Sequence, residues 1–263
     1  MLLVIDIGNT NTVIGIYDKK NLKARFRVAT ELKSTSDQLV ATLFNMFMIH
    51  DIRIEDIEDT IISCVVPDVL YNWESANRKL FDKDAKAVDY DTYTGITIDY
   101  ENPSEVGADR IVDAVAAYEL YGGPSVVVDM GTAITLDVIT SDGRYLGGSI
   151  APGIRIAQDG LFGKTAKLPK IELKQPTTAI TESTSEAINA GIVIGYIGMI
   201  DKLIETIEDE IVERLEIDKS EINVIATGGF SELISQSSKY INTIEPDLML
   251  EGLRIIYERN ANR

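Results

Sequence analysis

The sequence predicts an α/β fold of two similar halves, each a mixed sheet flanked by helices, with the active-site cleft between them. Two observations predict it. Asp6-Ile-Gly-Asn-Thr10 ends one apolar strand, and Asp129-Met-Gly-Thr-Ala133 ends another about half a chain later. An order of three strands followed by a helix occurs around both segments. Such a repeat would place two phosphate loops face to face across a cleft.

Apolar patterns define the elements of the first half, residues 1–121. In one helix Leu39, Leu43 and Phe47 recur at helical spacing, with Ser36 as the expected N-cap. We expect strands at Leu2–Asp6, Thr12–Tyr17, Leu22–Val28, Thr60–Val66 and Lys86–Val88, and helices at Ser36–Ile49, from Pro67 onward and at Ser104–Tyr121.

Gly122-Gly123-Pro124 stops the last of these helices and begins the second half, residues 122–263. Ser141-Asp142-Gly143 is typical of a hairpin turn. Thr165–Thr181 is predicted to be a long loop, and such loops are often functional. We expect strands at Val126–Asp129, Ala133–Thr140, Tyr145–Ile150 and Asn223–Ala226, and helices at Ile154–Phe162, at Glu182–Leu215 with a break, and at Leu248–Tyr257.

Acidic residues dominate the charge of the chain. Its 263 residues include 42 acidic against 25 basic ones, which gives a formal net charge of −17. That charge opposes binding to nucleic acid or to an anionic membrane, so neither partner is expected. Any anionic ligand must meet locally concentrated positive groups.

Cysteine usage and hydropathy indicate a cytoplasmic protein. Cys64 is the single cysteine and forms no internal disulfide, which fits a reducing compartment. Asp6 interrupts the first apolar run, which argues against a signal peptide. The apolar segment Ala187–Ile200 contains Asn189 and is too short to span a bilayer. It is predicted to be a buried helix whose glycines allow close approach of a neighbouring helix, from this chain or from another subunit.

The two aspartate segments have the residues that phosphate binding needs. Gly8 allows a tight turn, and Asn9–Thr12 offer consecutive N–H groups and hydroxyls to phosphate oxygens. Asp6 and Asp129 suit Mg²⁺, which is usually held by one or two carboxylates together with substrate phosphates. A single segment of this kind is an ordinary hairpin turn at least as often as it is a phosphate loop. The presence of a second copy half a chain later favours the interpretation as phosphate loops.

A third acidic segment lies at the start of a predicted helix. Asp109 and Arg110 fall in its first turn, where the carboxylate could accept a hydroxyl proton and the guanidinium could attract an anion. Alternatively, Asp109 stabilises the helix by interacting with its dipole, and Arg110 forms an ion pair on the surface.

Late in the chain, Thr227-Gly228-Gly229 follows a strand. A loop of this kind either packs against a nucleoside or serves the geometry of the turn alone.

Several familiar motifs are excluded. Gly163-Lys164-Thr165 is not a P-loop, because Gln158 stands where its first glycine is required. No Gly-x-Gly-x-x-Gly follows a strand, which argues against a dinucleotide fold. His50 is the only histidine and is interpreted as structural, so the sequence offers no transition-metal site.

Together the motifs resemble the superfamily of sugar kinases, actin and heat-shock chaperones, whose halves are ribonuclease H-like. Within it the chain resembles the type III pantothenate kinases. The Gly-Ala-Asp-Arg block is the most specific part of the resemblance, because the wider superfamily shares the aspartate loops. The matching motifs are Asp6-Ile-Gly-Asn-Thr10, Asn102-Pro-Ser-Glu-Val-Gly-Ala-Asp-Arg110, Asp129-Met-Gly-Thr-Ala133, Gly147-Gly148 with Pro152-Gly153, Thr165-Ala-Lys-Leu-Pro169 and Thr227-Gly228-Gly229.

The resemblance implies ATP-dependent phosphorylation of the terminal hydroxyl of pantothenate, the first step toward coenzyme A, by a homodimer. Asp109 would accept the hydroxyl proton, Asp6 would organise Mg²⁺, and Asp129 would bind a monovalent cation, K⁺ or NH₄⁺. The ATP-binding residues would be Asp6, Ile7, Gly8, Asn9, Thr10, Asn11, Thr12, Val13, Thr132, Gly228 and Gly229. The pantothenate-binding residues would be Tyr100, Gly107, Ala108, Asp109, Arg110 and Thr184.

Two other functions stay open at the level of the sequence. The phosphate loops also fit another hydroxylated acceptor, such as a sugar or a small carboxylic acid, against which the Gly-Ala-Asp-Arg block and Tyr100 argue. The second is a regulatory relative that keeps the fold but acts by binding. The carboxylates of Asp6, Asp109 and Asp129 argue against it.

Overall fold

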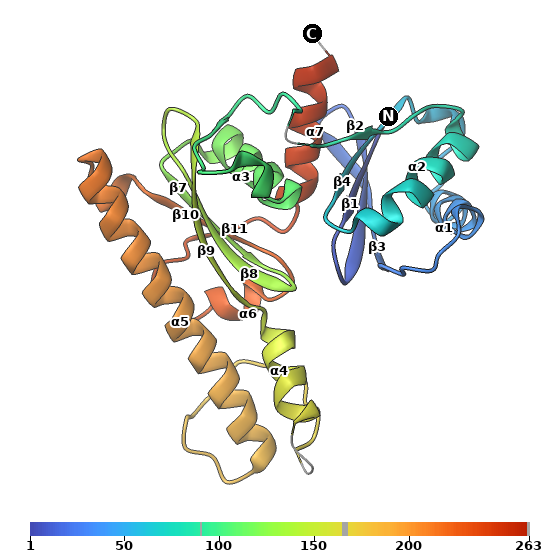
Figure 1. The fold of residues 1–263 in the computed structure, drawn as a ribbon. Coiled ribbons are helices and arrows are strands. Elements are labelled where there is room, and N and C mark those ends of the chain that lie inside the picture. Colours follow the sequence, from blue (N-terminus) through green and yellow to red (C-terminus); the bar gives the residue numbers. More distant parts are fainter. Residues whose placement is uncertain (90, 165–167, 262–263) are drawn as a thin grey trace. The chain divides into compact units, whose positions relative to one another are not determined.

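Two separate sheets organise the chain, each within its own unit (Figure 1). The computed structural model describes residues 1–89, 91–164 and 168–261. Unit 1 comprises residues 1–97, 101–116 and 248–263, and unit 2 comprises residues 98–100 and 117–247. These units are defined by contacts in space, whereas the predicted halves were defined by the repeated order of strands along the sequence. The predicted boundary after Tyr121 therefore stays a prediction.

The sheet of unit 1 has the order β3-β2-β1-β4-β5. Its first three strands pair antiparallel, whereas β4 and β5 join β1 in parallel. The strands are β1 (Leu2–Ile7), β2 (Asn11–Asp18), β3 (Asn21–Ala29), β4 (Asp59–Cys64) and β5 (Lys86–Ala87). The helices that pack on this sheet are α1 (Ser36–Ile49), α2 (Pro67–Phe81), α7 (Leu248–Ala261) and the first part of α3 (Ala108–Tyr121).

The two faces of this sheet carry different helices. Leu3, Ile5 and Ile7 pack in a core with α1 and α2. Leu2 and Val4 pack in a second core with residues of α3 and α7. Because successive side chains of a strand point to opposite faces, the next member of this second series, Asp6, is on the face that α3 and α7 cover.

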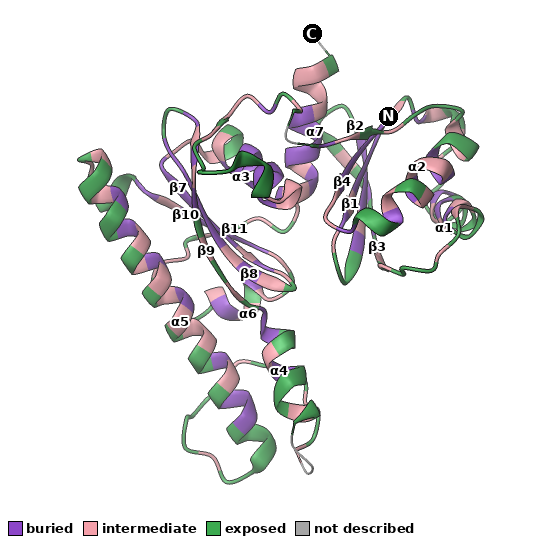
Figure 2. Cartoon of the chain, viewed as in Figure 1, coloured by how far each residue is buried: buried purple, intermediate pink, exposed green. Residues whose placement is uncertain are grey.

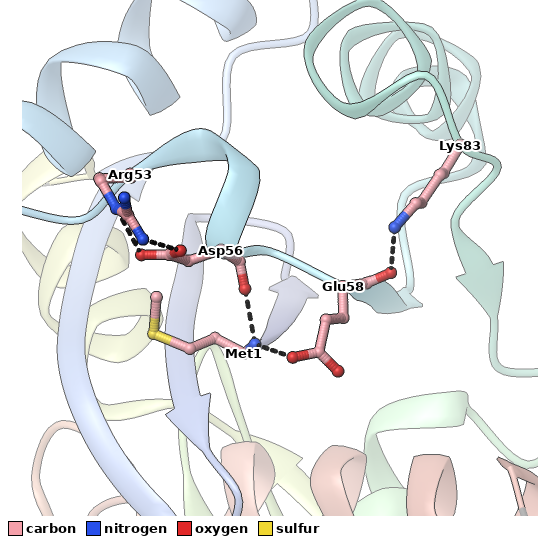
Figure 3. Close-up of polar contacts among 5 residues, drawn as sticks. All are labelled: Met1, Arg53, Asp56, Glu58 and Lys83. Atoms are coloured by element: carbon pink, nitrogen blue, oxygen red, sulfur yellow. Dashed lines mark hydrogen bonds and ion pairs between the residues drawn. The ribbon is translucent and has the colours of Figure 1, made fainter.

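Contacts of Met1 fix the start of β1 beside β4 (Figure 3). Its nitrogen lies 2.6 Å from the carbonyl oxygen of Asp56 and 3.0 Å from Oε1 of Glu58. The amide of Glu58 donates to the carbonyl of Met1 at 2.8 Å, and Lys83 Nζ donates to the carbonyl of Glu58 at 2.7 Å. Arg53 holds the Asp56 carboxylate from the other side. These bonds set the register in which Asp6 lies opposite Ser63.

Unit 2 repeats the strand order of unit 1. Its sheet runs β11-β10-β7-β8-β9-β6, so that β9-β8-β7-β10-β11 corresponds to β3-β2-β1-β4-β5 in both order and strand direction. This correspondence confirms the predicted α/β fold of two similar halves. The strands are β6 (Thr97–Ile98), β7 (Ser125–Met130), β8 (Ala133–Ile139), β9 (Arg144–Pro152), β10 (Asn223–Thr227) and β11 (Thr243–Ile244). The helices are α4 (Ile154–Gly163), α5 (Thr184–Leu215) and α6 (Ser231–Ser235).

Most predicted elements are confirmed, with differences at their ends. Thr35, not Ser36, caps α1, because the side chains of Thr35 and Gln38 form a capping box. The helix expected from Ser104 begins at Ala108, since Pro103–Glu105 forms a separate 3₁₀ turn. The break expected within Glu182–Leu215 is wrong, because α5 is continuous.

Helix α7 joins unit 1 although it comes last in the chain. Its Gly252 lies so close to the backbone carbonyl of Val112 in α3 that a Cβ atom there would overlap it. Glu251 accepts a hydrogen bond from the Tyr17 hydroxyl at 2.8 Å and pairs with Arg254 at 2.8 Å. The C-terminal helix therefore closes the core on the Asp6 face of the first sheet.

Helix α5 is long and apolar enough, by length and composition, to cross a membrane. Three of its apolar residues, Val193, Ile200 and Ile204, are buried in the core of unit 2. The prediction that Ala187–Ile200 is buried holds for only one side, since exposed residues alternate with buried ones (Figure 2). A Cβ atom added to its three glycines would meet no described atom within 4 Å.

Candidate active site

The first predicted phosphate loop is a tight turn between β1 and β2. The amide of Gly8 donates to the carbonyl of Asn11 at 3.1 Å, which leaves Asn9 and Thr10 exposed at the tip. After the turn, Thr12 is buried, and its hydroxyl lies 2.9 Å from that of Thr30. The predicted residues from Asp6 to Val13 therefore form the ends of β1 and β2 and the turn between them, in which Asn9–Asn11 are exposed.

Next to Asp6 lies a hydroxyl that the sequence analysis missed. Ser63 is paired with Asp6 in the β1–β4 register, is completely buried, and its Oγ has no hydrogen-bond partner among the described residues. Paired residues of neighbouring strands point to the same face, so this hydroxyl accompanies the Asp6 carboxylate. A buried unpaired hydroxyl is rare and suggests that a water or ligand satisfies it.

Cys64, the residue after Ser63, does not have the properties of a reactive thiol. Its thiol is half-buried and donates to the carbonyl of Val66 at 3.2 Å. Burial raises the pKa of the Cys64 thiol, and the negative charges of Asp6 and Glu74 raise it further. The thiol is therefore protonated and unreactive at neutral pH.

The Gly107–Arg110 block forms the start of α3. The Asp109 carboxylate accepts a hydrogen bond from the backbone N–H of Arg110 at 2.9 Å. A Cβ atom at Gly107 would overlap that carboxylate. Arg110 is 8% exposed, so the alternative of a surface ion pair does not describe its position. Ala108 packs in the core between α7 and the Asp6 face of the sheet. The structure thus places Asp6 and the start of α3 on one face of unit 1.

Asp129 lies among glycine loops in unit 2. The β7–β10 register pairs it with Thr227, the residue before Gly228. Gly228 has φ +88°, and a Cβ atom on it would lie 2.5 Å from Asp129 Oδ1 and 2.7 Å from the amide nitrogen of Met130. The amide of Gly153 donates to the carbonyl of Thr132 at 3.1 Å. The second aspartate loop and the Gly-Gly loop therefore meet at one point.

Tyr100 and Thr184 are both in unit 2 but have different surroundings. The Tyr100 ring covers Gly147, where a Cβ atom would lie 2.7 Å from its Cε2, and stands 6.4 Å from the Tyr145 ring. Thr184 is exposed at the start of α5, and its side chain makes no hydrogen bond with the described residues. The structure does not bring these two predicted pocket residues into contact.

Unit 2 also contains a residue pair that no motif marked. The guanidinium carbon of Arg155 lies 5.7 Å from the ring centroid of Phe230. Arg155 follows the Pro152-Gly153 motif by two residues and Phe230 follows Gly228-Gly229. Their positions next to these motifs were the only feature of the sequence that could have pointed to this pair.

Of the Thr165–Pro169 motif, residues 165–167 lie outside the described residues.

Comparisons with solved structures show which proteins share this fold. The chain is similar to a conserved protein from Campylobacter jejuni, provisionally assigned as a Baf family transcriptional activator, with 21% identity, a TM-score of 0.61 and coverage of 99% of this chain and 100% of that one. It is also similar to component A of (R)-2-hydroxyglutaryl-CoA dehydratase from Acidaminococcus fermentans, with 13% identity, a TM-score of 0.51 and coverage of 100% and 99%. Both likenesses extend over essentially the whole chain and support its doubled α/β fold.

The sequence profile described as type III pantothenate kinase matches residues 2–206. The chain belongs to the type III pantothenate kinase family. It is accordingly a kinase of the coenzyme A pathway.

Gly228 offers a test of the geometry around Asp129. Gly228→Ala should lower the free energy of unfolding by about 2 kcal/mol, because alanine is strained at positive φ and its Cβ would collide with Asp129 and Met130. Gly229→Ala is the matched control, since a Cβ there meets no described atom within 4 Å. Urea unfolding measures both variants. Equal stability of the two would contradict this geometry.

Proposed function

We propose that this protein transfers the γ-phosphoryl group of ATP to the terminal hydroxyl of pantothenate. One observation carries the proposal: the Gly107–Arg110 block begins a helix on the same sheet face as the Asp6 loop. A proton acceptor and a phosphate loop then belong to one compact unit, which helps to hold them in the fixed geometry that phosphoryl transfer requires. The family membership supports the same acceptor.

Asp109 acts as the proton acceptor in this proposal. Its carboxylate is half-buried and oriented by the amide of Arg110. Phosphoryl transfer has a loose transition state in which the hydroxyl loses its proton late, so a carboxylate of ordinary basicity suffices. The buried guanidinium of Arg110 would bind the acceptor's carboxylate, with Gly107 and Ala108 beside it. A role of Tyr100 and Thr184 in binding the acceptor rests on the family resemblance alone.

Asp6 would hold Mg²⁺ together with the phosphates of ATP. Among the described residues no three His, Cys, Asp or Glu side chains gather as a metal site. This fits Mg²⁺, which is usually bound by one or two carboxylates, substrate phosphates and waters. The buried unpaired hydroxyl of Ser63 beside Asp6 gives one of those waters a partner. When bound, the ion neutralises phosphate charge, while Asn9–Thr12 contribute backbone donors.

Asp129 would hold the monovalent cation, K⁺ or NH₄⁺, in unit 2. The absence of side chains at Gly131 and Gly228 leaves room at its carboxylate, because a Cβ at Gly131 would lie 3.1 Å from Oδ2 and one at Gly228 would lie 2.5 Å from Oδ1. Thr132, Gly228 and Gly229 would contact ATP there. A weakly hydrated cation at this position offsets the repulsion between Asp129 and the phosphates.

A cytoplasmic homodimer completes the proposal. The side of α5 that carries Gly191, Gly195 and Gly198 has no packing partner among the described residues, and Ile194 on it is 44% exposed. A helix of a second subunit would bury this surface.

The first experiment measures ADP release by the purified protein with ATP, Mg²⁺ and K⁺. Pantothenate should stimulate release and yield phosphopantothenate by mass, whereas glucose and glycerol should not. Release with another acceptor would overturn the substrate. Ligand binding without turnover would favour a regulatory relative, a function to which the name of the Campylobacter jejuni protein also points.

Asp109→Asn should reduce turnover about 10²-fold or more, because the amide cannot accept the hydroxyl proton. Asp68→Asn is the matched control, since Asp68 occupies the first turn of α2. Both variants should keep the circular dichroism spectrum and melting temperature of the wild type. Near-normal turnover of Asp109→Asn would remove this residue as the base.

Replacing K⁺ with Na⁺ or a bulky organic cation at constant ionic strength should lower activity, and NH₄⁺ should restore it. The reason is the room for a cation at the Asp129 carboxylate. Steady-state assays over a range of K⁺ concentrations measure the effect, and Asp129→Asn should flatten the K⁺ response. Activity that is independent of the monovalent cation would contradict the assignment.

A further inference from the structure

Arg155 lies at the unit 2 loops but belongs to none of the predicted sites. It is the second residue of α4, directly after the segment in which the Gly153 amide bonds to the Thr132 carbonyl. Its guanidinium carbon lies 5.7 Å from the centroid of the Phe230 ring, and Phe230 follows Gly228-Gly229. The guanidinium is therefore placed among the loops that surround Asp129.

None of the described residues forms an ion pair that neutralises the charge of Arg155. Arg155 makes no ion pair or hydrogen bond with the residues that the structure describes. Other arginines of unit 2 are paired: Arg144 with Asp99 and Asp142, and Arg214 with Glu210. An aromatic ring orients a guanidinium over its face but leaves its N–H donors available to an anion.

We propose that Arg155 binds a phosphate group of the nucleotide, with the Phe230 ring holding its guanidinium in place. This inference rests on the proposed kinase function and adds a residue to it. A planar guanidinium matches two phosphate oxygens at once, which an ammonium does not. In a chain of net charge −17, with the Asp129 carboxylate at the same loops, an unpaired arginine offsets the charge of a phosphate group bound there.

A comparison of two ligands isolates the contact with phosphate. Isothermal titration of the full-length chain with Mg²⁺-ADP and with adenosine reports the phosphate contribution separately from that of the nucleoside. Arg155→Gln should weaken Mg²⁺-ADP binding about tenfold or more and leave adenosine binding unchanged. Arg155→Lys should recover part of the loss. Arg214→Gln is the matched control, because Arg214 is exposed on α5 and pairs with Glu210.

The remaining outcomes separate this inference from the proposed function. If the wild type binds Mg²⁺-ADP and Arg155→Gln binds it equally well, the role of Arg155 is overturned and the kinase function stands. Equal losses for adenosine and Mg²⁺-ADP, with a lower melting temperature, would show that Arg155 only packs against Phe230. A higher KM for pantothenate with unchanged Mg²⁺-ADP affinity would reassign Arg155 to the acceptor. A wild type that binds no nucleotide would overturn both proposals.

Discussion

The central strand of each sheet ends in the same constrained way. β1 and β7 each pair antiparallel with the next strand in the chain and parallel with a strand that returns later, β4 or β10. Asp6 and Asp129 are each the penultimate residue of that central strand. Because both neighbours are hydrogen-bonded to it, the strand cannot slip, and a slip of one residue would turn the carboxylate to the opposite face. Within each unit, the side to which the carboxylate points depends on this register.

The turns after the two carboxylates differ in a way that suits different ligands. β1 and β2 are separated by Gly8-Asn9-Thr10, whereas β7 and β8 are separated only by Gly131-Thr132. The longer turn exposes more backbone donors, as the proposed phosphate loop needs. The shorter turn keeps Asp129 close to the backbone around Gly228, where the proposed cation would lie beside the carboxylate. Similar halves therefore support different proposed roles without any change in strand order.

Local sequence patterns predicted the elements but not their partners. The spacing of Leu250, Leu253 and Ile256 predicts a helix, yet only tertiary packing of Gly252 on Val112 assigns it to unit 1. No strand was predicted at β6 or β11, because strands of two residues carry little periodic signal, although the equally short β5 was predicted. For the site, composition and motif marked the aspartate loops and Arg110. The burial of Arg110 and the pairing of Ser63 with Asp6 depend on packing and strand register, which no local pattern encodes.

Glycine beside carboxylate is the arrangement that links the fold to the proposed chemistry. A Cβ atom at Gly107 would overlap the Asp109 carboxylate, and one at Gly228 would lie 2.5 Å from that of Asp129. Because glycine has no side chain, each of these positions leaves space beside a carboxylate oxygen that, in the proposed mechanism, accepts a proton or binds a cation. In an acidic chain, such carboxylates also repel the negative charge of phosphate. Backbone donors, bound cations and a few well-placed guanidinium groups must therefore provide the attraction, which makes the position of each arginine more important than the number of basic residues.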